Sequence, residues 1–560
     1  MKVSEEILKK ILLAPGFITE TQFIEVAKEA KEENRPIEDI LVEKDLISDR
    51  KLGELIADEF GYNFVSLEKE IISEKILNIV PELVARKQKI ITFDQDKEGL
   101  KLAMANPENL EIIKLLEKKT GNKIIPYFAT ERDIQEALIK YRKDVREELG
   151  GIIEEGIKEI DGVKIKEAPI IRIVDSLLRY SYFNKASDIH IEPYEDRAVV
   201  RFRIDGILHD VITLPRKMHE PVVTRVKILS KLRTDEHQAA QDGRLEFKIP
   251  GVKEKTDVRV SIVPITKGEK IVLRILSERS RQFSLKNLGF FPEDFKKVKA
   301  SIKKPWGMIL ATGPTGCGKT TTLYAILKIL NKRELNIATI EDPVEYDIEG
   351  INQIQVNPKT NLTFAKGLRA IVRQDPDIIM VGEIRDKETA SIAINSAMTG
   401  HLVLSTLHTN DAATTFPRFL DMGIEPFLVT STINIVIAQR LVRNICENCK
   451  ESYELPRNSK LTATLPQDLK QKLFKGKTKI LLYRGKGCKF CNNTGYLGRI
   501  GIFEVLEMEE NVKKLIMVRA NAGQIQVQAI KNGMTTMFDD GIKKVLKGIT
   551  TIEEVMRVVR

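Results

Sequence analysis

The segment GPTGCGKT, Gly313 to Thr320, has the spacing of a phosphate-binding loop, G-x-x-x-x-G-K-[ST]. It follows an apolar run, Met308–Ala311, that predicts a strand and precedes a stretch, Thr321–Leu330, that predicts a helix. Glycines in such a loop let backbone N–H groups and the next helix N-terminus converge on phosphate oxygens. The predicted nucleotide contacts are Gly313, Pro314, Thr315, Gly316, Cys317, Gly318, Lys319, Thr320 and Thr321.

Three side chains in this loop have distinct expected roles. Lys319 would supply a positive charge for the β- and γ-phosphates of ATP, and the Thr320 hydroxyl would bind Mg²⁺. Cys317 lies where a small side chain is all that the site requires, so we expect it to fill space rather than act as a nucleophile.

Two acidic segments downstream could supply the carboxylates that hydrolysis needs. DPDIIMVGEIRD places Glu383 just after an apolar strand, as in a Walker B segment whose acid faces Mg²⁺ and its waters. TIEDPVEY crowds Glu341, Asp342 and Glu345 around a proline at the end of another predicted strand. Groups that orient or deprotonate water gather at the ends of parallel strands. An acidic turn that caps a helix or lies in solvent is the alternative for TIEDPVEY.

The segment GHLVLSTLHTN carries His401 and His408 at the two ends of a further apolar strand. Residues seven apart on a strand point to opposite faces, so these histidines are not expected to share one metal ion. A lone histidine at a strand end is usually structural. His408, which precedes Thr, Asn and Asp, is the candidate sensor of the γ-phosphate.

Two CxxC pairs form the second strong pattern, Cys446-x2-Cys449 and Cys488-x2-Cys491. Four thiolates in two such pairs favour tetrahedral Zn²⁺ and leave no open coordination position, so the site should be structural. It would tie the excursion between the pairs, Lys450 to Gly487, to the rest of its domain. Four reduced core thiols or a redox pair are the alternatives.

The elements that must position these residues follow from the apolar pattern. From about Leu288 onward, the runs GMILAT, IATIED, DIIMVGE and HLVLSTL alternate with helical segments, which predicts a parallel sheet covered by helices on both faces. Residues 168–285 open with an amphipathic helix and continue with strands such as AVVRFRI and DVRVSIV, which predicts a compact α+β domain. Its turns are expected at Asp205-Gly206 and Asp242-Gly243.

The N-terminal third divides into smaller parts. Within residues 1–60, GFITETQFIEVAKEA and DLISDRKLGELIADEF recur about 29 residues apart, which predicts two similar helical units. Residues 61–140 mix short strand-like and helical runs and predict a small α/β subdomain. The charged segment 141–167 predicts a linker, and residues 286–560 hold the predicted ATPase domain with a zinc-knuckle insertion at 446–491.

Composition excludes several classes of protein. The 560 residues are 42% hydrophobic and 30% charged, which fits a folded globular chain rather than a disordered one. The start, MKVSEEILKK, shows no secretory signal, and no apolar run approaches the ~20 residues of a membrane span, so a cytoplasmic protein is expected. The net charge of +10 is the difference between 90 basic and 80 acidic residues spread along the chain, which indicates a solvated surface.

Taken together, these motifs resemble those of the secretion-superfamily ATPases, the type IV pilus assembly ATPase and its type II secretion counterpart. The motifs that carry the resemblance are ASDIHIEP (186–193), VRFRIDG (200–206), GPTGCGKTTTLYA, TIEDPVEY, DPDIIMVGEIRD, GHLVLSTLHTND, MGIEPF (422–427), AQRLVR (438–443) and GCKFCNNTGYLGRIGIFE (487–504). They extend over nearly the whole chain. Retraction motors of this group lack both the long N-terminal region and the four cysteines, so assembly or secretion is favoured over retraction.

The resemblance implies a RecA-like core, a PAS-like domain at 168–285 and a homohexameric ring that closes on Mg²⁺-ATP. It implies that Glu345 activates the water, that Glu383 lies near Mg²⁺ and that His408 contacts the nucleotide. Arginines of the PAS-like domain, with Arg203 and Arg225 as candidates, would reach the γ-phosphate. The ring would act on an inner-membrane platform protein from the cytoplasmic side.

The N-terminal repeat resembles a domain that binds cyclic di-GMP in some relatives. Its Arg-x-Gly element is missing around Ile7–Lys9 and Pro36–Glu38, which argues against that ligand and favours docking onto membrane assembly proteins. Two other functions compete with the motor. A DNA-translocating motor needs a basic channel lined by aromatic residues, which one tryptophan and scattered charges do not provide, and DNA-stimulated ATPase activity would reveal it. A nucleotide-gated scaffold would lack the acidic residues that are present here.

Overall fold

The computed structural model describes residues 3–559 except 16, 34–35, 44–45, 68–69, 71, 139–149, 152–166, 250–254, 277–283, 459–461, 463–466, 475 and 489–490. The chain forms two compact units, Met1–Arg279 and Ser280–Arg560. Apart from Gly150, Gly151 and Glu167, the linker expected at 141–167 lies outside the described residues. Among the helices that the structure describes, none combines the length and apolar composition that a membrane span requires.

The first unit begins with the helices α1 (Glu5–Leu13), α2 (Glu20–Glu33), α3 (Ile37–Glu43) and α4 (Asp49–Phe60). Ser4 and Ser48 cap α1 and α4 by accepting hydrogen bonds from backbone N–H groups of the first turn. Helices α2 and α4 begin at Glu20 and Asp49, at the spacing of the sequence repeat. The apolar faces of these four helices pack into one core around Leu8, Phe23 and Leu41.

A small sheet follows, with the described strands in the order β1-β4-β3-β2. Strand β4 is parallel to both β1 and β3, and β2 is antiparallel to β3. The elements are β1 (Asn63–Phe64), α5 (Glu74–Leu77), α6 (Glu82–Gln88), β2 (Ile90–Gln95), β3 (Leu100–Met104), α7 (Leu110–Thr120), β4 (Ile124–Phe128) and α8 (Glu131–Ala137). This part has its own apolar core, which includes Ile91, Leu102 and Ile113.

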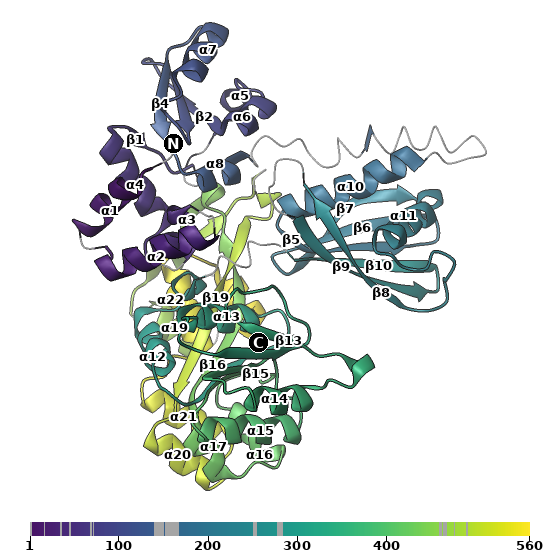
Figure 1. Ribbon diagram of the computed structural model, residues 1–560, viewed down its shortest axis with the longest axis vertical. Helices are drawn as coiled ribbons and strands as arrows, with labels where there is room; N and C mark the ends of the chain where they lie inside the picture. Colours follow the sequence, from purple (N-terminus) through teal and green to yellow (C-terminus); the bar gives the residue numbers. More distant parts are fainter. Residues whose placement is uncertain are drawn as a thin grey trace. The chain divides into compact units, whose positions relative to one another are not determined.

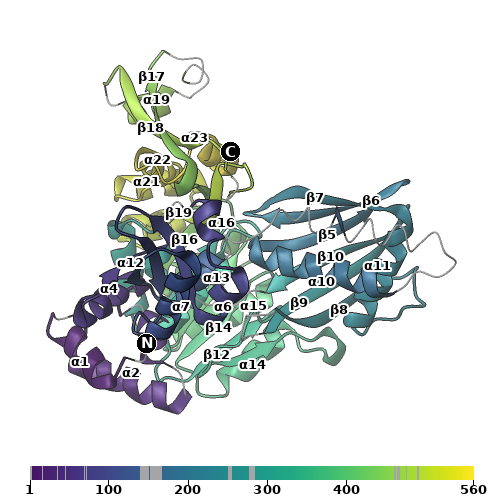
Figure 2. The same ribbon diagram turned by 90° about the horizontal axis from the view of Figure 1, so that it is seen from above.

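The last part of the first unit is an antiparallel sheet with the described strands in the order β7-β6-β5-β10-β9-β8. Its elements are α10 (Glu167–Phe183), β5 (Ala186–Pro193), β6 (Arg197–Ile204), β7 (Ile207–Pro215), α11 (Arg216–Leu229), β8 (Gln241–Lys248), β9 (Lys255–Ile265) and β10 (Gly268–Leu276). Helices α10 and α11 cover the apolar face of the sheet, as Figures 1 and 2 show. The expected α+β architecture is therefore present.

Of the two turns predicted in this sheet, one is present and the other prediction is wrong. Asp205-Gly206 does join β6 to β7, with φ of 50° and 85° at the two residues. Asp242-Gly243 lies inside β8 and pairs with β9. A Cβ at Gly243 would lie 3.0 Å from both the Ser230 carbonyl oxygen and a methyl carbon of Leu232, so this glycine permits close packing rather than a turn.

The second unit is built on a mostly parallel sheet with the described strands in the order β13-β12-β14-β15-β11-β16-β19, of which only β19 is antiparallel to its neighbour. The strands are β11 (Gly307–Thr312), β12 (Ile337–Glu341), β13 (Asn352–Gln355), β14 (Ile378–Val381), β15 (Leu402–Leu407), β16 (Ile433–Ile445) and β19 (Tyr496–Glu507). Four of them, β11, β12, β14 and β15, are the apolar runs read from the sequence.

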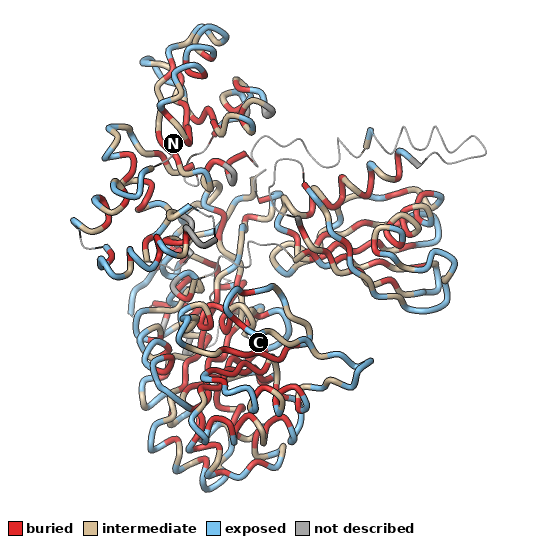
Figure 3. The backbone as a smooth tube through the Cα atoms, viewed as in Figure 1, coloured by how far each residue is buried: buried red, intermediate tan, exposed pale blue. Residues whose placement is uncertain are grey.

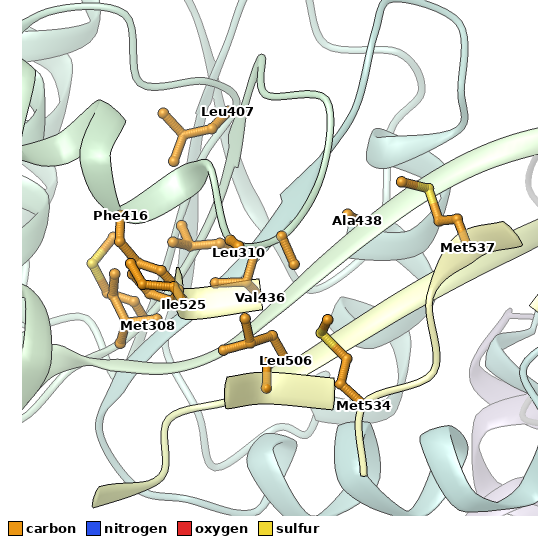
Figure 4. Close-up of a cluster of buried hydrophobic side chains, with 14 of the residues drawn as sticks. Met308, Leu310, Leu407, Phe416, Val436, Ala438, Leu506, Ile525, Met534 and Met537 are labelled. Carbon is orange, nitrogen blue, oxygen red and sulfur yellow. The ribbon is translucent and has the colours of Figure 1, made fainter. Parts of the chain in front are cut away.

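Both faces of this sheet are buried because successive side chains alternate between them. On β11, Met308 and Leu310 join one core, and Ile309 and Ala311 join the other. Figure 3 shows these central strands as the buried interior of the unit. Figure 4 shows the first core, where Met308, Leu310 and further buried side chains of the unit come together.

Helices cover the two faces of the sheet. Side chains of α12 (Pro292–Ile302) and α13 (Lys319–Leu330) pack into one core, and those of α14 (Phe364–Val372) and α15 (Lys387–Met398) pack into the other. The remaining described helices are the 3₁₀ turns η3 (Leu285–Leu288), η4 (Pro358–Thr360) and η5 (Glu447–Cys449), and α16 (Thr415–Asp421), α17 (Pro426–Thr432), α19 (Gln467–Phe474), α20 (Glu510–Met517), α21 (Ala522–Lys531), α22 (Met537–Leu546) and α23 (Ile552–Val559).

Between β16 and β19 the chain leaves the main sheet. Strands β17 (Lys450–Pro456) and β18 (Lys479–Gly485) pair with each other in antiparallel fashion, and α19 lies in the connection between them. Figure 2 shows this hairpin projecting from the rest of the second unit. It corresponds to the excursion that the cysteine pairs were predicted to enclose.

Candidate ATP-hydrolysis site and metal site

The phosphate-binding loop connects the buried strand β11 to helix α13, as the motif predicts. The backbone φ angles of Gly313, Gly316 and Gly318 are 146°, 77° and 89°, values that residues with a Cβ rarely adopt. A Cβ at Gly313 would lie 2.5 Å from the Cys317 sulfur and 2.6 Å from the Gln439 carbonyl oxygen. The first glycine is therefore required by close packing as well as by backbone conformation.

Lys319 is the first residue of α13, and its ammonium group turns back over the loop. It donates hydrogen bonds to the carbonyl oxygens of Gly313 at 2.9 Å and Pro314 at 3.2 Å. Burial lowers the pKa of Lys319. A phosphate anion next to this ammonium would offset that effect, so the position suits a nucleotide-binding lysine.

Gln439 of β16 anchors the loop from the neighbouring strand. Nε2 of its side-chain amide donates to the Cys317 carbonyl oxygen at 2.7 Å, and Oε1 of the same amide accepts a hydrogen bond from the Thr322 hydroxyl at 2.7 Å. Sequence reasoning gave Gln439 no role, although AQRLVR was among the motifs of the resemblance. Cys317 is buried and its pKa is raised by that burial, which agrees with a packing role for its thiol.

Glu383 and His408 come together at the carboxyl ends of adjacent strands, β14 and β15. The Glu383 carboxylate lies 3.3 Å from Nε2 of His408 and 2.6 Å from the Arg385 guanidinium. Its side chain is only 11% exposed. The charge of Glu383 also acts on Lys319, where it opposes the lowering of that pKa.

The acidic segment after β12 contains two glutamates in different surroundings. Glu341 is buried, and its carboxylate accepts hydrogen bonds from Thr339, Tyr324 and Gln353. Burial raises the pKa of Glu341. Glu345 is exposed, and its backbone N–H donates to the Tyr324 hydroxyl at 3.4 Å. Tyr324 lies on α13, so the segment is attached to the helix that follows the phosphate-binding loop.

The remaining histidine and arginine candidates lie in separate places. His401 lies just before β15, and its Nδ1 atom is 2.9 Å from the Ser396 carbonyl oxygen. This contact fits the structural role predicted for it. Arg203 of β6 lies 3.4 Å from the Asp188 carboxylate within its own sheet. Arg225 lies on α11, and its charge acts on Asp175 of α10. Whether either arginine reaches a nucleotide stays a prediction.

The four cysteines of the predicted metal site form a cluster at the base of the β17–β18 hairpin. Their sulfur atoms all lie within 4.8 Å of one another, and two pairs, Cys446 with Cys488 and Cys449 with Cys491, are separated by 3.8 Å. Backbone N–H groups of Cys488 and Gly495 point at the Cys491 sulfur at 3.2 Å, which favours a thiolate there. The cluster could hold a tetrahedral metal ion such as Zn²⁺.

Glu504 of β19 is a buried carboxylate that sequence reasoning also missed. It accepts a hydrogen bond at 3.1 Å from the backbone of Ala412, four residues after His408. Burial raises the pKa of Glu504 to about 7. The chain therefore holds a titratable group against the segment that follows the histidine.

This titration predicts a pH-dependent stability. The unfolded chain loses the Glu504 proton near pH 4.5, whereas the folded chain keeps it up to about pH 7, so stability falls as the pH rises between these values. From pH 6 to pH 8 the loss is about 1 kcal/mol. Glu504→Gln is expected to remove this part of the slope in urea unfolding measured at both pH values. An unchanged slope would show that Glu504 does not titrate in this range.

This fold and site define a RecA-like P-loop ATPase, in which a glycine-rich loop, the Glu383 carboxylate and His408 lie at the carboxyl ends of a parallel sheet. A model of the family described as type II/IV secretion system protein matches residues 164–557, and the chain belongs to this family. A second model, described as MshEN domain, matches residues 60–148. That match falls on the small α/β part and not on the repeated helices.

Curated relatives cover most of the chain. The type IV pilus assembly ATPase PilB of Myxococcus xanthus is 38% identical over 562 residues, 98% of this chain and 98% of that protein. The type II secretion system ATPase E of Vibrio cholerae is 47% identical over 396 residues, 70% of this chain and 76% of that protein. The solved structure of the Legionella pneumophila ATPase DotB has a TM-score of 0.50 at 20% identity, covering 69% of this chain and 95% of that one, which shows a shared fold. The chain is an ATP-hydrolysing enzyme.

Proposed function

We propose that this chain is the motor of a homohexameric ring that uses ATP hydrolysis to drive type IV pilus assembly at the cytoplasmic face of the inner membrane. The observation that carries the proposal is the full-length match to the pilus assembly ATPase of Myxococcus xanthus, which includes the N-terminal parts as well as the ATPase unit. An inner-membrane platform protein is the partner on which the ring would act.

The site supports a defined division of labour in hydrolysis. Lys319 and the N–H groups of the loop hold the phosphates of ATP, and Thr320 with Glu383 would hold the Mg²⁺ that neutralises their charge. Glu345, exposed next to α13, would take the proton of the attacking water. His408, paired with Glu383, would report loss of the γ-phosphate through the Walker B acid.

A type II secretion motor is the second candidate, favoured by the 47% identity to the Vibrio cholerae ATPase over the C-terminal part of the chain. Deletion of the gene in the organism that carries it distinguishes the two. Loss of surface pili with normal protein export, restored by the wild-type gene and not by Lys319→Ala, is expected. Intact pili with retained export substrates would favour secretion, and no change in either would contradict both.

The cysteine cluster is proposed to hold one structural Zn²⁺ per chain. Removal of the Zn²⁺ by a chelator, or the change Cys491→Ser, is expected to lower the free energy of unfolding by a few kcal/mol, because the base of the hairpin loses its cross-link. This loss corresponds to a fall of roughly 5–10 °C in melting temperature. Metal content and thermal unfolding measure this. Cys317→Ser is the matched control, since this thiol is outside the cluster, and it should keep the metal. A protein purified without metal and indifferent to chelator would refute the site.

A further inference from the structure

Arg440 of β16 lies beside the phosphate-binding loop without an acidic partner among the described residues. Its Nη1 atom is buried and has no hydrogen-bond partner there, and a Cβ added to Gly313 would come within 3.5 Å of that atom. Arg443, three residues further along the same strand, is instead paired with Glu554 at 2.6 Å. Two arginines of one strand therefore differ in whether an acidic side chain pairs with them in the part of the chain that the structure describes.

The other nitrogens of Arg440 reach two further segments. Nε donates to the Val558 carbonyl oxygen in the C-terminal helix α23 at 3.3 Å. Nη2 donates to the side chain of Asn410 at 3.4 Å, two residues after His408. Both contacts are long for hydrogen bonds, so little is lost if the guanidinium moves. One side chain thus lies beside the phosphate-binding loop and contacts both the segment after His408 and helix α23.

The charges around the loop indicate what would neutralise Arg440. Lys319 and Arg440 are like charges near the same turn of backbone, and Arg440 adds to the effect of burial in lowering the pKa of Lys319. A partly buried guanidinium without a counter-ion is costly, and an anion that binds the loop relieves that cost. The triphosphate of ATP is such an anion.

We propose that Arg440 is a positioning residue that responds to the phosphate charge held by the loop and passes the change to Asn410 and to helix α23. This rests on the proposal that nucleotide binds at Gly313–Thr320. Binding would draw the guanidinium toward the loop, and its contacts with Val558 and Asn410 would change with it. The C-terminal helix would then differ between the nucleotide-free and nucleotide-bound states.

The test compares Arg440→Gln and Arg440→Lys with the wild-type chain in three measurements. These are the affinity for a fluorescent ATP analogue, kcat and KM for ATP, and hydrogen exchange of the segment 552–558 with and without a non-hydrolysable ATP analogue. Arg440→Gln is expected to weaken nucleotide binding about tenfold and to abolish the nucleotide-dependent change in exchange. Arg440→Lys should restore much of the affinity through its charge but not the exchange response, because it lacks the planar fork.

Arg443→Gln is the matched control because it loosens α23 without lying at the loop. It should raise exchange of 552–558 equally with and without nucleotide and leave the affinity unchanged. An Arg440→Gln variant with wild-type affinity, kcat, KM and exchange response would overturn the inference; if that variant fails to fold, the exchange response of Arg440→Lys decides. A wild-type chain that binds no ATP analogue would overturn the proposed nucleotide site as well, which separates the two failures.

Discussion

Replacing Lys319 with alanine is expected to reduce ATP turnover at least about 100-fold, because the proposed phosphate site loses the ammonium of its loop. The variant should unfold at the wild-type temperature or slightly higher. Burial disfavours the charged form of Lys319 in the absence of nucleotide, and removal of the ammonium relieves this cost, which offsets the loss of its hydrogen bonds to the Gly313 and Pro314 carbonyl oxygens. Phosphate release and thermal unfolding of the same preparation measure both effects.

Lys328→Ala is the matched control for this prediction. Lys328 lies in the last turn of α13, so its removal takes the same charge from the same helix far from the loop. Turnover by this variant should stay close to wild type. Full activity of Lys319→Ala would contradict the assignment of the loop, and a large loss of thermal stability would show that the lysine is structural.

Much of the ATPase unit could be predicted because its signals are local. The runs that became β11, β12, β14 and β15 are apolar on both faces, and this property follows directly from a parallel sheet covered on both sides. The cysteine pairs were likewise readable, since the spacing within each pair already fits a metal site. In the antiparallel sheet, Asp205-Gly206 was recognisable for the same reason, because the turn lies between two strands that pair directly.

The missed features depend on contacts between residues far apart in the chain. Gln439 holds the loop at the Cys317 carbonyl oxygen, which is 122 residues away, and Arg440 reaches Val558, which is 118 residues away. Nothing in the local pattern of AQRLVR marks these side chains as neighbours of the nucleotide loop. Gly243 was misassigned because Asp-Gly signals a turn only where the chain reverses, and here the neighbouring Leu232 demands a small residue within a strand.

Glu345→Gln is expected to reduce turnover by roughly 10²–10⁴-fold while nucleotide binding stays intact, because the amide cannot accept the proton of the attacking water. The exposed position of Glu345 next to α13 leaves its binding contribution small. Single-turnover hydrolysis and the affinity for a fluorescent ATP analogue separate the two effects. Turnover near wild type in Glu345→Gln would remove this residue from the mechanism.

Glu341→Gln provides the comparison that decides between the two glutamates of the segment. Glu341 is 2% exposed and accepts hydrogen bonds from three side chains, so water has little access to its carboxylate. Its raised pKa indicates that burial disfavours the charged form, and a neutral amide should therefore be tolerated there at a cost of about 1–3 kcal/mol for the disturbed hydrogen bonds. Glu341→Gln should thus lose stability and keep more turnover than Glu345→Gln. The reverse order of activities would place the catalytic base at Glu341, with Tyr324 and Thr339 positioning it.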